Sequence, residues 1–290
     1  MPRQQLPKPS MQLLSQRSLR SCTRQTDKGR ITAEAVLLST DCEIVARIAA
    51  AADTFIIEQA VWELLRQGAE YAPSGGAVPA LIGAEAYFGV APALSRAFPD
   101  PAQDFVREMF AECVKAVLQS ETYLYTQRGF ASGQEYQDNW DVSHPDSCRY
   151  YSHLDIVESR WFDHIGPQPR TGNLFHRHKN VAVWHCGQVG LQATGSFLDS
   201  FHEVGVMVDC SATGTIERFD ATFMRAPDRI CFGTAELVQA MVGKNVRELT
   251  RRDINRCAGG GEGCAHLLDI SRDTLAELAK SITAIDGLCR

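Results

Sequence analysis

The sequence predicts an α+β fold made of two related halves, each an antiparallel sheet with helices packed on one face. Three observations support this prediction. The 290 residues are 44% hydrophobic and 22% charged, which is the composition of a globular protein that buries a sizeable core. Strand-like stretches, Gly-containing turns and helical spacing occur in both the first and the last third of the chain. The third observation is that these two parts align with each other.

The alignment has a constant offset of 160 residues and needs no gap. His202-Glu203-Val204 falls on Cys42-Glu43-Ile44, and Gly243 falls on Gly83. The order of strand, turn, strand, helix and glycine is the same in both parts. We therefore predict a degenerate internal repeat of residues 29–128 and 188–290, with residues 129–187 inserted between them. Chance similarity between two α+β segments is the alternative that the sequence leaves open.

The individual elements follow in chain order. Residues 1–28 hold six Lys and Arg against one acid, so we expect a mobile basic arm, or a segment draped over a partner in a homodimer. A mitochondrial targeting peptide is the alternative. Residues 102–127 repeat apolar side chains at helical spacing between Pro101 and Gly129, and form the clearest predicted helix.

The C-terminal part begins with strand-like sequence over residues 189–224, broken by a tight turn. A short helix then follows, with Thr234 as its N-cap and Gly243 just past its end. A last helix opens at Ser271.

Composition excludes several classes of protein. A net charge of −6 argues against a nucleic-acid surface, because phosphate binding needs clustered Lys and Arg. No apolar run approaches the roughly 20 residues that span a membrane, and the N-terminus has no secretory signal. The ten cysteines are scattered without a CxxC pair, which predicts reduced thiols in a cytoplasmic protein.

The segment 129–187 is the strongest compositional anomaly. It holds six of the eight histidines and three of the four tryptophans. Aromatic faces with hydrogen-bonding tips are typical of a pocket for a flat, partly polar ligand. We predict that the segment lines the site, and the alternative is a packed interdomain loop. The predicted substrate-binding residues are Tyr136, Trp140, Trp161, Trp184 and His185.

The stretch NLFHRHKNVAVWHCG places His176 and His178 two residues apart, so they share one face of a strand. Neutral imidazoles beside cations are suited to proton transfer near pH 7. Zinc or iron is the alternative, with a third ligand from His185, His202 or His266, but no HExxH or CxxC motif accompanies the pair. Structural histidines are the other alternative. The predicted catalytic residues, without metal or other cofactor, are His176, His178, Tyr150, Tyr151, Lys179, Arg177 and His202.

Two further clusters lie in the last third. Asp199, His202 and Glu203 stand at the start of an apolar strand, where they serve either in acid–base chemistry or as a solvated strand end. Cys264 and His266 follow a glycine run that lacks the Lys-Ser/Thr of a phosphate loop. A Cys–His nucleophile pair is conceivable there. Side chains two apart at a helix start should point away from each other, so the sequence leaves the role of Cys231, Cys264 and His266 open.

The motifs SFHEVGV, RAPDRIC and GCAHLLDI resemble the bacterial domain-of-unknown-function family 2889 over about residues 190–285. The matching positions are His202, Arg225, Pro227, Cys231, Gly243, Cys264, His266 and Leu267. The N-terminal half and the aromatic insert depart from the family pattern. The family name implies a domain and no activity.

Some relatives are similar to cofactor-independent lyases of aromatic catabolism, which release formaldehyde from lignin-derived phenolic dimers. The resemblance implies a base for the carbinol proton, a cationic or tyrosine partner for a phenolate, and a slot for two rings. The function that we expect is therefore a carbon–carbon lyase with a small aromatic substrate. A metal-dependent hydrolase using His176 and His178, and a non-catalytic aromatic-ligand-binding protein, are the alternatives.

Overall fold

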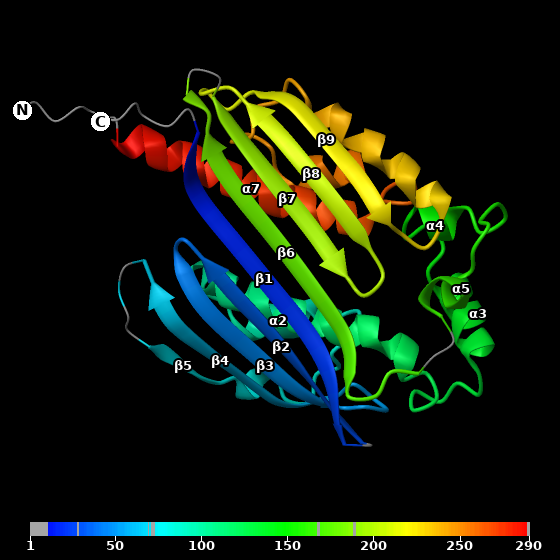
Figure 1. Cartoon of the computed structure of the whole chain (residues 1–290). Coiled ribbons are helices and arrows are strands. Elements are labelled where there is room, and N and C mark those ends of the chain that lie inside the picture. Colours follow the sequence, from blue (N-terminus) through cyan, green and yellow to red (C-terminus); the bar gives the residue numbers. More distant parts are fainter. Residues whose placement is uncertain are drawn as a thin grey trace, which may run out of the picture.

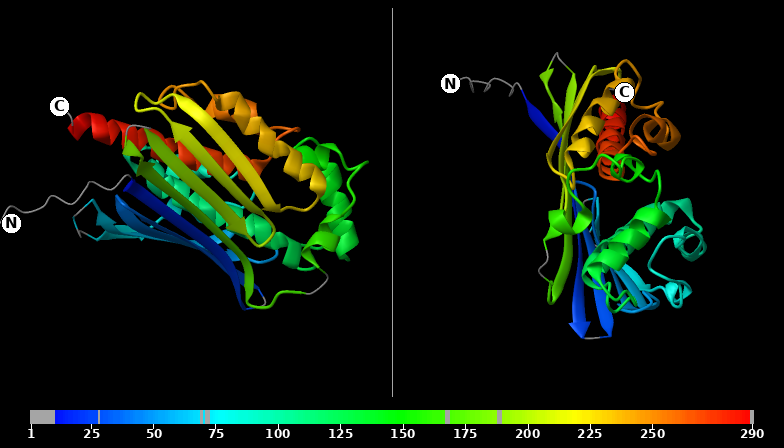
Figure 2. Two further views of the ribbon diagram at one scale, coloured as in Figure 1. Left: turned by 45° about the horizontal axis from the view of Figure 1, so that its top comes forward. Right: turned by 90° about the vertical axis from the view of Figure 1, so that its right-hand side faces the viewer.

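The computed structural model describes residues 11–288, apart from residues 28, 69, 71, 72, 167, 168, 188 and 189. The fold is α+β: one nine-stranded antiparallel sheet, in the order β5-β4-β3-β2-β1-β6-β7-β8-β9, with helices packed on one face (Figures 1 and 2). We expected a separate sheet in each half. The structure corrects this, because β1 pairs with β2 on one side and with β6 on the other, which joins the halves into one sheet.

The strands are β1 (Gln12–Asp27), β2 (Arg30–Ser39), β3 (Cys42–Ala51), β4 (Ile57–Gln67), β5 (Ser74–Ala77), β6 (Asn173–His185), β7 (Leu191–Asp199), β8 (Glu203–Cys210) and β9 (Ile216–Arg225). The α-helices are α1 (Ala91–Ala97), α2 (Asp104–Ser120), α3 (Gly133–Ser143), α4 (Arg149–Ser152), α5 (Trp161–Ile165), α6 (Arg251–Ala258) and α7 (Ala265–Leu288). Short 3₁₀ segments are η1 (Pro79–Leu81), η2 (Pro101–Gln103), η3 (Glu121–Tyr123) and η5 (Arg229–Met241).

The strands bury every second residue, as a sheet covered on one face requires. In β2, Ile31, Ala33 and Leu37 are buried, while the side chains between them are more exposed. β7 alternates in the same way over its whole length. Figure 2 shows the consequence in its right-hand view, where the long helices α2 and α7 lie on one side of the sheet and leave its other side largely uncovered.

The predicted helix over residues 102–127 is confirmed as α2, with η2 before it and η3 after it. Of the other predicted helix boundaries, the end at Gly243 is confirmed, since this residue directly follows the C-cap Val242 with a φ of 82°. The predicted starts at Thr234 and Ser271 were wrong. Residues 229–241 form the 3₁₀ segment η5, and its N-cap is Asp228, whose carboxylate accepts from Ile230 N; Thr234 instead donates to the carbonyl of Cys231. The last helix, α7, begins six residues before Ser271, at Ala265, because His266 and Leu267 continue the helical spacing.

The basic arm predicted for residues 1–28 is corrected where the structure describes it. Residues 12–27 form β1, a central strand whose buried Leu19, Ser21 and Thr23 face the helices. The hydropathy pattern did not indicate this strand, because several of its buried residues are small and polar. Residues 1–10 and residue 28 lie outside the described residues. The bounds of the predicted insert 129–187 are corrected as well. Its last part, residues 173–185, is not irregular but forms strand β6 beside β1.

Two apolar cores lie under the helices. One joins β1–β4 to α1 and α2, and the other joins β6–β9 to η5, α6 and α7. Between them, where α2 and α7 meet the central strands, buried side chains are charged rather than apolar. None of the described helices is both long and apolar enough to cross a membrane.

The order of elements in β1–β4 with α2 recurs in β6–β9 with α7. At the offset of 160, the first residue of each strand in one set lies one residue from its counterpart. The start of α2, Asp104, likewise lies one residue from the position that corresponds to Ala265. This is a likeness in the order and spacing of elements, and the duplication itself stays a prediction.

Candidate active site

A pocket opens where the ends of β7 and β8 meet the helices α3 and α4, the segment η5 and the start of α7. Its walls are largely aromatic and thiol-bearing, with imidazoles at one end. It is lined by Leu118, Gln119, Thr122, Tyr136, Gln137, Trp140, Cys148, Arg149, Tyr150, Tyr151, Trp161, His202, Phe223, Pro227, Cys231, Thr234, Gly263, Cys264, Ala265 and His266. The segment between the halves therefore contributes the aromatic wall, and the C-terminal half contributes the imidazoles.

The turn between β7 and β8 holds an aspartate against a histidine. Asp199 Oδ1 accepts from the backbone N–H of Phe201 at 2.8 Å and of His202 at 2.7 Å, which fixes the turn. The same oxygen lies 3.2 Å from His202 Nδ1. A carboxylate on Nδ1 orients the ring and leaves Nε2 as the nitrogen free for chemistry. Of the second predicted cluster, Asp199 and His202 are thus in contact.

His266, from the first turn of α7, stacks on His202 with ring centroids 3.7 Å apart and planes 24° apart. Its Nε2 is 3.9 Å from Asp199 Oδ2, and its Nδ1 is 3.8 Å from Cys264 Sγ. We expected Cys264 and His266 to point apart, which was wrong. Cys264 precedes the helix, so its side chain does not follow the helical directions on which that expectation rested. The two C-terminal clusters of the sequence form one site.

Burial controls the protonation of these groups. Burial lowers the pKa of His266 well below its usual value, and His202 and Arg177 add to the effect. Burial raises the pKa of the Cys264 thiol to about 12, so it is a neutral donor rather than a thiolate nucleophile. Burial alone would raise the pKa of Asp199, but His202, His266 and Arg177 together hold it well below its usual range. Asp199 is therefore the fixed negative charge of the site.

The three tyrosines of the pocket differ in what their hydroxyls do. Tyr150 donates to the carbonyl of Ser159 at 3.2 Å, and Tyr136 donates to Glu121 at 3.4 Å. Tyr151 has no hydrogen-bond partner for its hydroxyl among the described residues, although burial raises its pKa above the usual value. Tyr151 is therefore the pocket phenol that is free to bind a ligand.

The three tryptophans predicted to bind substrate do not all line the pocket. Trp161 Nε1 donates to Thr122 Oγ1 at 2.8 Å and Trp140 Nε1 donates to Glu121 at 3.2 Å, so both rings are fixed at the pocket wall. Trp184 and His185 lie on β6 and do not line the pocket. Five of the predicted aromatic residues therefore share one pocket, while these two lie elsewhere.

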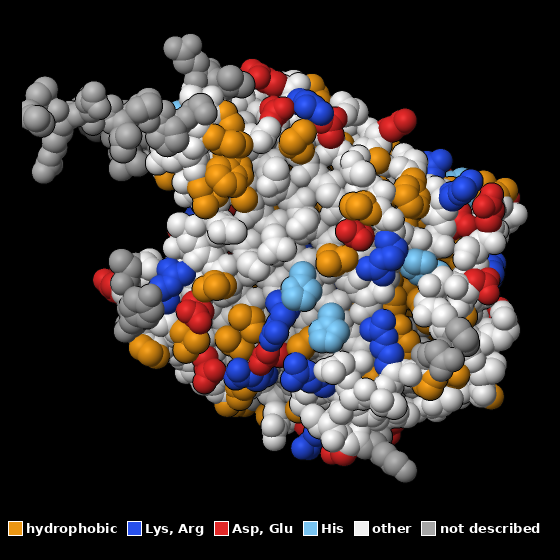
Figure 3. All heavy atoms as spheres, in the orientation of Figure 1, with side chains coloured by type: hydrophobic (Ala, Val, Ile, Leu, Met, Phe, Trp, Pro, Cys, Tyr) orange, Lys and Arg blue, Asp and Glu red, His pale blue; other side chains and the backbone are white. Residues whose placement is uncertain are grey.

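The histidines of the stretch NLFHRHKNVAVWHCG lie away from this pocket. His176 and His178 point to the uncovered face of the sheet, the face that Figure 3 shows with histidine side chains near its middle. Burial and neighbouring cations lower the pKa of both. The alternation of β6 turns Arg177 and Lys179 to the opposite, covered face. The predicted catalytic set is thus split by the sheet.

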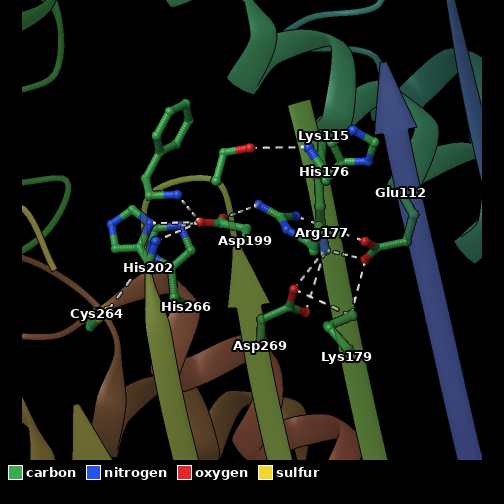
Figure 4. Close-up of polar contacts among 12 residues, drawn as sticks. Glu112, Lys115, His176, Arg177, Lys179, Asp199, His202, Cys264, His266 and Asp269 are labelled. Carbon is green, nitrogen blue, oxygen red and sulfur yellow. Dashed lines mark hydrogen bonds and ion pairs between the residues drawn. The ribbon is translucent and has the colours of Figure 1, made fainter. Parts of the chain in front are cut away.

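Arg177 and Lys179 belong to a buried ion cluster next to the pocket rather than to its lining. Arg177 Nη2 is 3.4 Å from Asp199 Oδ2, and Lys179 Nζ is 3.1 Å from Glu112 Oε1. Figure 4 shows Asp199 between the two imidazoles and Arg177. Sequence reasoning missed Glu112. The signal was a carboxylate inside the apolar stripe of α2, three residues after Met109 and one before Cys113, both fully buried.

Among the described residues, Asp199, His202 and His266 form the single group of three metal-type donors that lie together. Their arrangement fits a shared proton better than a tetrahedral ion. The stacked rings run nearly parallel, so their lone pairs do not converge on one point. Asp199 Oδ1 already accepts from two amides and an imidazole, and the guanidinium of Arg177 lies close by.

One family model matches part of the chain. Residues 192–280 match the family described as Protein of unknown function (DUF2889). The match spans β7 to most of α7 and so includes Asp199, His202, Cys264 and His266, whereas the tyrosines and tryptophans of the pocket wall lie outside it. It confirms the resemblance of the C-terminal third. A comparison with curated proteins gave no match.

Proposed function

We propose that this protein is an enzyme that performs acid–base chemistry on a small phenolic compound. The observation that carries the proposal is the buried Asp199–His202 pair at the end of an aromatic-walled pocket. An aspartate on Nδ1 prepares Nε2 to take a proton and stabilises the imidazolium that forms. Tyrosine and tryptophan walls favour a flat substrate that carries hydroxyl groups.

The reaction we propose is cleavage of a carbon–carbon bond with release of formaldehyde. His202 removes the proton of a primary carbinol, and the bond between the carbinol carbon and the neighbouring carbon breaks. Its electron pair forms a new alkene, and an aryl ether oxygen on the next carbon leaves and takes up a proton. Formaldehyde, an alkene and a phenol are the products, so no oxidant or reductant is consumed.

The free hydroxyl of Tyr151 supplies the complementary donor. In this proposal it gives a hydrogen bond, or a proton, to the leaving oxygen, and the proton on His202 then restores it. Tyr150 is a wall residue in this assignment, because its hydroxyl is already used by Ser159. Arg177 and Lys179 do not touch the substrate, since both are buried outside the pocket lining.

Each of the two alternative functions is supported by a different feature of the pocket. A metal-dependent hydrolase would use Asp199, His202 and His266 rather than His176 and His178, because these three are the donors that lie together. A ligand-binding protein without turnover would need only the aromatic wall. The buried, ionised Asp199 favours the enzyme, because a pocket that only binds phenols gains nothing from a carboxylate held behind an imidazole.

The test is formaldehyde release from phenolic dimers that carry a primary hydroxymethyl group, by protein washed with chelator. We expect release with the wild type and with His178→Asn, and loss with His202→Asn. Turnover that appears only after zinc or iron is added would favour the metal-dependent hydrolase. A rise in melting temperature with the same dimers and no turnover would favour the binding protein.

A further inference from the structure

The carboxylate beneath His202 is connected to the N-terminal half through one side chain. Arg177 of β6 lies with Nη2 3.4 Å from Asp199 Oδ2 and Nη1 3.8 Å from Glu112 Oε2 of α2. The exposed fraction of each of the three side chains is 4% or less, so water does not screen the contacts. The rings of Phe175 and Phe197 flank the guanidinium, with ring centroids 5.4 and 4.9 Å from its central carbon.

Glu112 is in turn held by two lysines. Its Oε1 accepts from Lys115 at 2.7 Å and from Lys179 at 3.1 Å, while Oε2 has no hydrogen-bond donor among the described residues and faces Arg177. Lys179 continues the cluster to Asp273 of α7 at 2.9 Å. The cluster therefore ties α2 to α7 across the central strands, with Asp199 at its end.

The cluster links charged side chains of α2, α7 and the central strands. Ion pairs between described residues join four cations, Arg17, Lys115, Arg177 and Lys179, to five carboxylates, Glu108, Glu112, Asp199, Asp269 and Asp273. Buried charges that lack a partner are costly, so the buried carboxylates of Asp199 and Glu112 depend on the Arg177 cation that lies between them.

We propose that Arg177 and Glu112 are positioning residues of the active site: the Glu112–Arg177 pair holds the Asp199 carboxylate in place behind His202. The N-terminal half thus serves the chemistry of the C-terminal half through α2. This inference rests on the proposed function, since it assigns His202 as the base. Neither residue touches the substrate.

The two side chains act on His202 with opposite sign. Removing the Arg177 cation leaves more negative charge near the imidazoles and favours their protonated form. Removing the Glu112 carboxylate leaves the positive charge of Arg177 less neutralised, which disfavours the protonated form of the imidazoles. The other titratable or charged groups that face His202 belong to four elements and stay unchanged: Asp199 of its own turn, Cys264 and His266 at α7, His164 of α5 and Arg225 of β9.

The experiment is an NMR titration of the His202 ring in the full-length protein, with His202→Asn used to assign the signal. We expect Glu112→Gln to lower the titration midpoint by about one pH unit and Arg177→Gln to raise it by about one pH unit. Arg177→Lys keeps the charge and should leave the midpoint near that of the wild type. Glu108→Gln is the matched control, because Glu108 belongs to the same cluster through Arg17, whereas the ion pairs of Arg177 are with Glu112 and Asp199.

Shifts of the same sign, or no shift in either variant, would overturn the inference. If Arg177→Gln does not fold, Glu112→Gln and Arg177→Lys still decide it. The titration needs no turnover, so the two proposals fail separately. Opposite shifts in a protein that cleaves no phenolic dimer would refute only the proposed reaction, and turnover without the shifts would refute only the positioning role.

Discussion

Two turns of this molecule are held by matching hydrogen bonds but carry different side chains. In the C-terminal half, Asp199 accepts from the backbone of residues 201 and 202 and contacts His202. In the N-terminal half, 160 residues earlier, Ser39 Oγ accepts from the backbone N–H of residues 41 and 42 at 3.2 and 3.0 Å and lies 3.6 Å from Cys42 Sγ. An arginine at the end of the next strand but one closes each turn.

The closing arginines donate to the carbonyls of the two turns in the same manner. Arg225 reaches Asp199 O and Ser200 O, and Arg66 reaches Ser39 O and Thr40 O. The scaffold is therefore alike in both halves, while a carboxylate and an imidazole are present in one alone. The candidate site therefore depends on these two side chains and on the aromatic wall, and not on the backbone of the turn.

Replacing the pair should produce the largest effect. We expect Asp199→Asn or His202→Asn to reduce kcat/KM by about a hundredfold to ten-thousandfold, because each removes the general base or its orienting partner. The matched variants Ser39→Ala and Cys42→Ser should keep it within about twofold. Initial rates of formaldehyde release measure both sets. An equal loss in both turns would show that the turns matter for folding alone.

Acid should destabilise the C-terminal half through His266, whose counterpart in α2 is Val106. The folded pKa of His266 lies below the unfolded value of about 6.5. Above pH 6.5 both states are neutral and stability is full. Below it the unfolded chain binds a proton that the folded chain does not, so the free energy of unfolding falls as pH falls, by about 1 kcal/mol for each pH unit.

Urea unfolding of the wild type and His266→Gln between pH 7.5 and 4.5 checks this sign. The variant should show a shallower decline over the same range. Parallel curves would mean that His266 titrates alike in both states, and would remove burial as the cause of its neutrality.

Within the aromatic wall, the two neighbouring tyrosines should also differ. Tyr151→Phe removes the free hydroxyl and should lower kcat about tenfold or more, with little change in the melting temperature. Tyr150→Phe removes the bond to Ser159 and should lower stability by about 1 kcal/mol with a smaller effect on kcat. The reverse pattern would exchange their roles. Steady-state kinetics and thermal melts on both proteins separate them.

The smallest effect is expected on the open face of the sheet. His176→Asn with His178→Asn should change kcat by less than about twofold and stability by about 0.5 kcal/mol or less, as for most surface positions. The same two measurements apply. A large loss of activity would contradict the division of β6 into an outer imidazole face and an inner cationic face.

Many residues of the candidate site could be predicted from the local sequence, but the way in which the fold brings them together could not. Aromatic enrichment located Tyr136, Trp140 and Trp161 correctly at one pocket, since a wall of rings leaves a compositional trace. The pattern around His176 and His178 gave the shared face correctly but not which face is covered. That depends on where α2 and α7 pack, which is a long-range property. The pairing of β1 with β6, far apart in sequence, is long-range in the same sense.

The fold class followed from periodicity, whereas the single sheet did not. In residues 12–27 the buried side chains include the small polar ones of Ser15, Ser21 and Thr23, and hydropathy does not separate such a strand from an arm. The ion pair of Glu112 and Lys179 could not be predicted for a similar reason. The role of a charged residue within an apolar stripe is known only when its ion-pair partners are known.

The most direct test of the account is the rate of formaldehyde release from a hydroxymethyl-bearing phenolic dimer by chelator-washed wild-type protein, Asp199→Asn and Cys42→Ser. The account predicts release by the wild type and by Cys42→Ser at similar rates, and a loss of a hundredfold or more in Asp199→Asn. Release that Asp199→Asn retains in full would contradict it, because the buried carboxylate would then have no part in the chemistry.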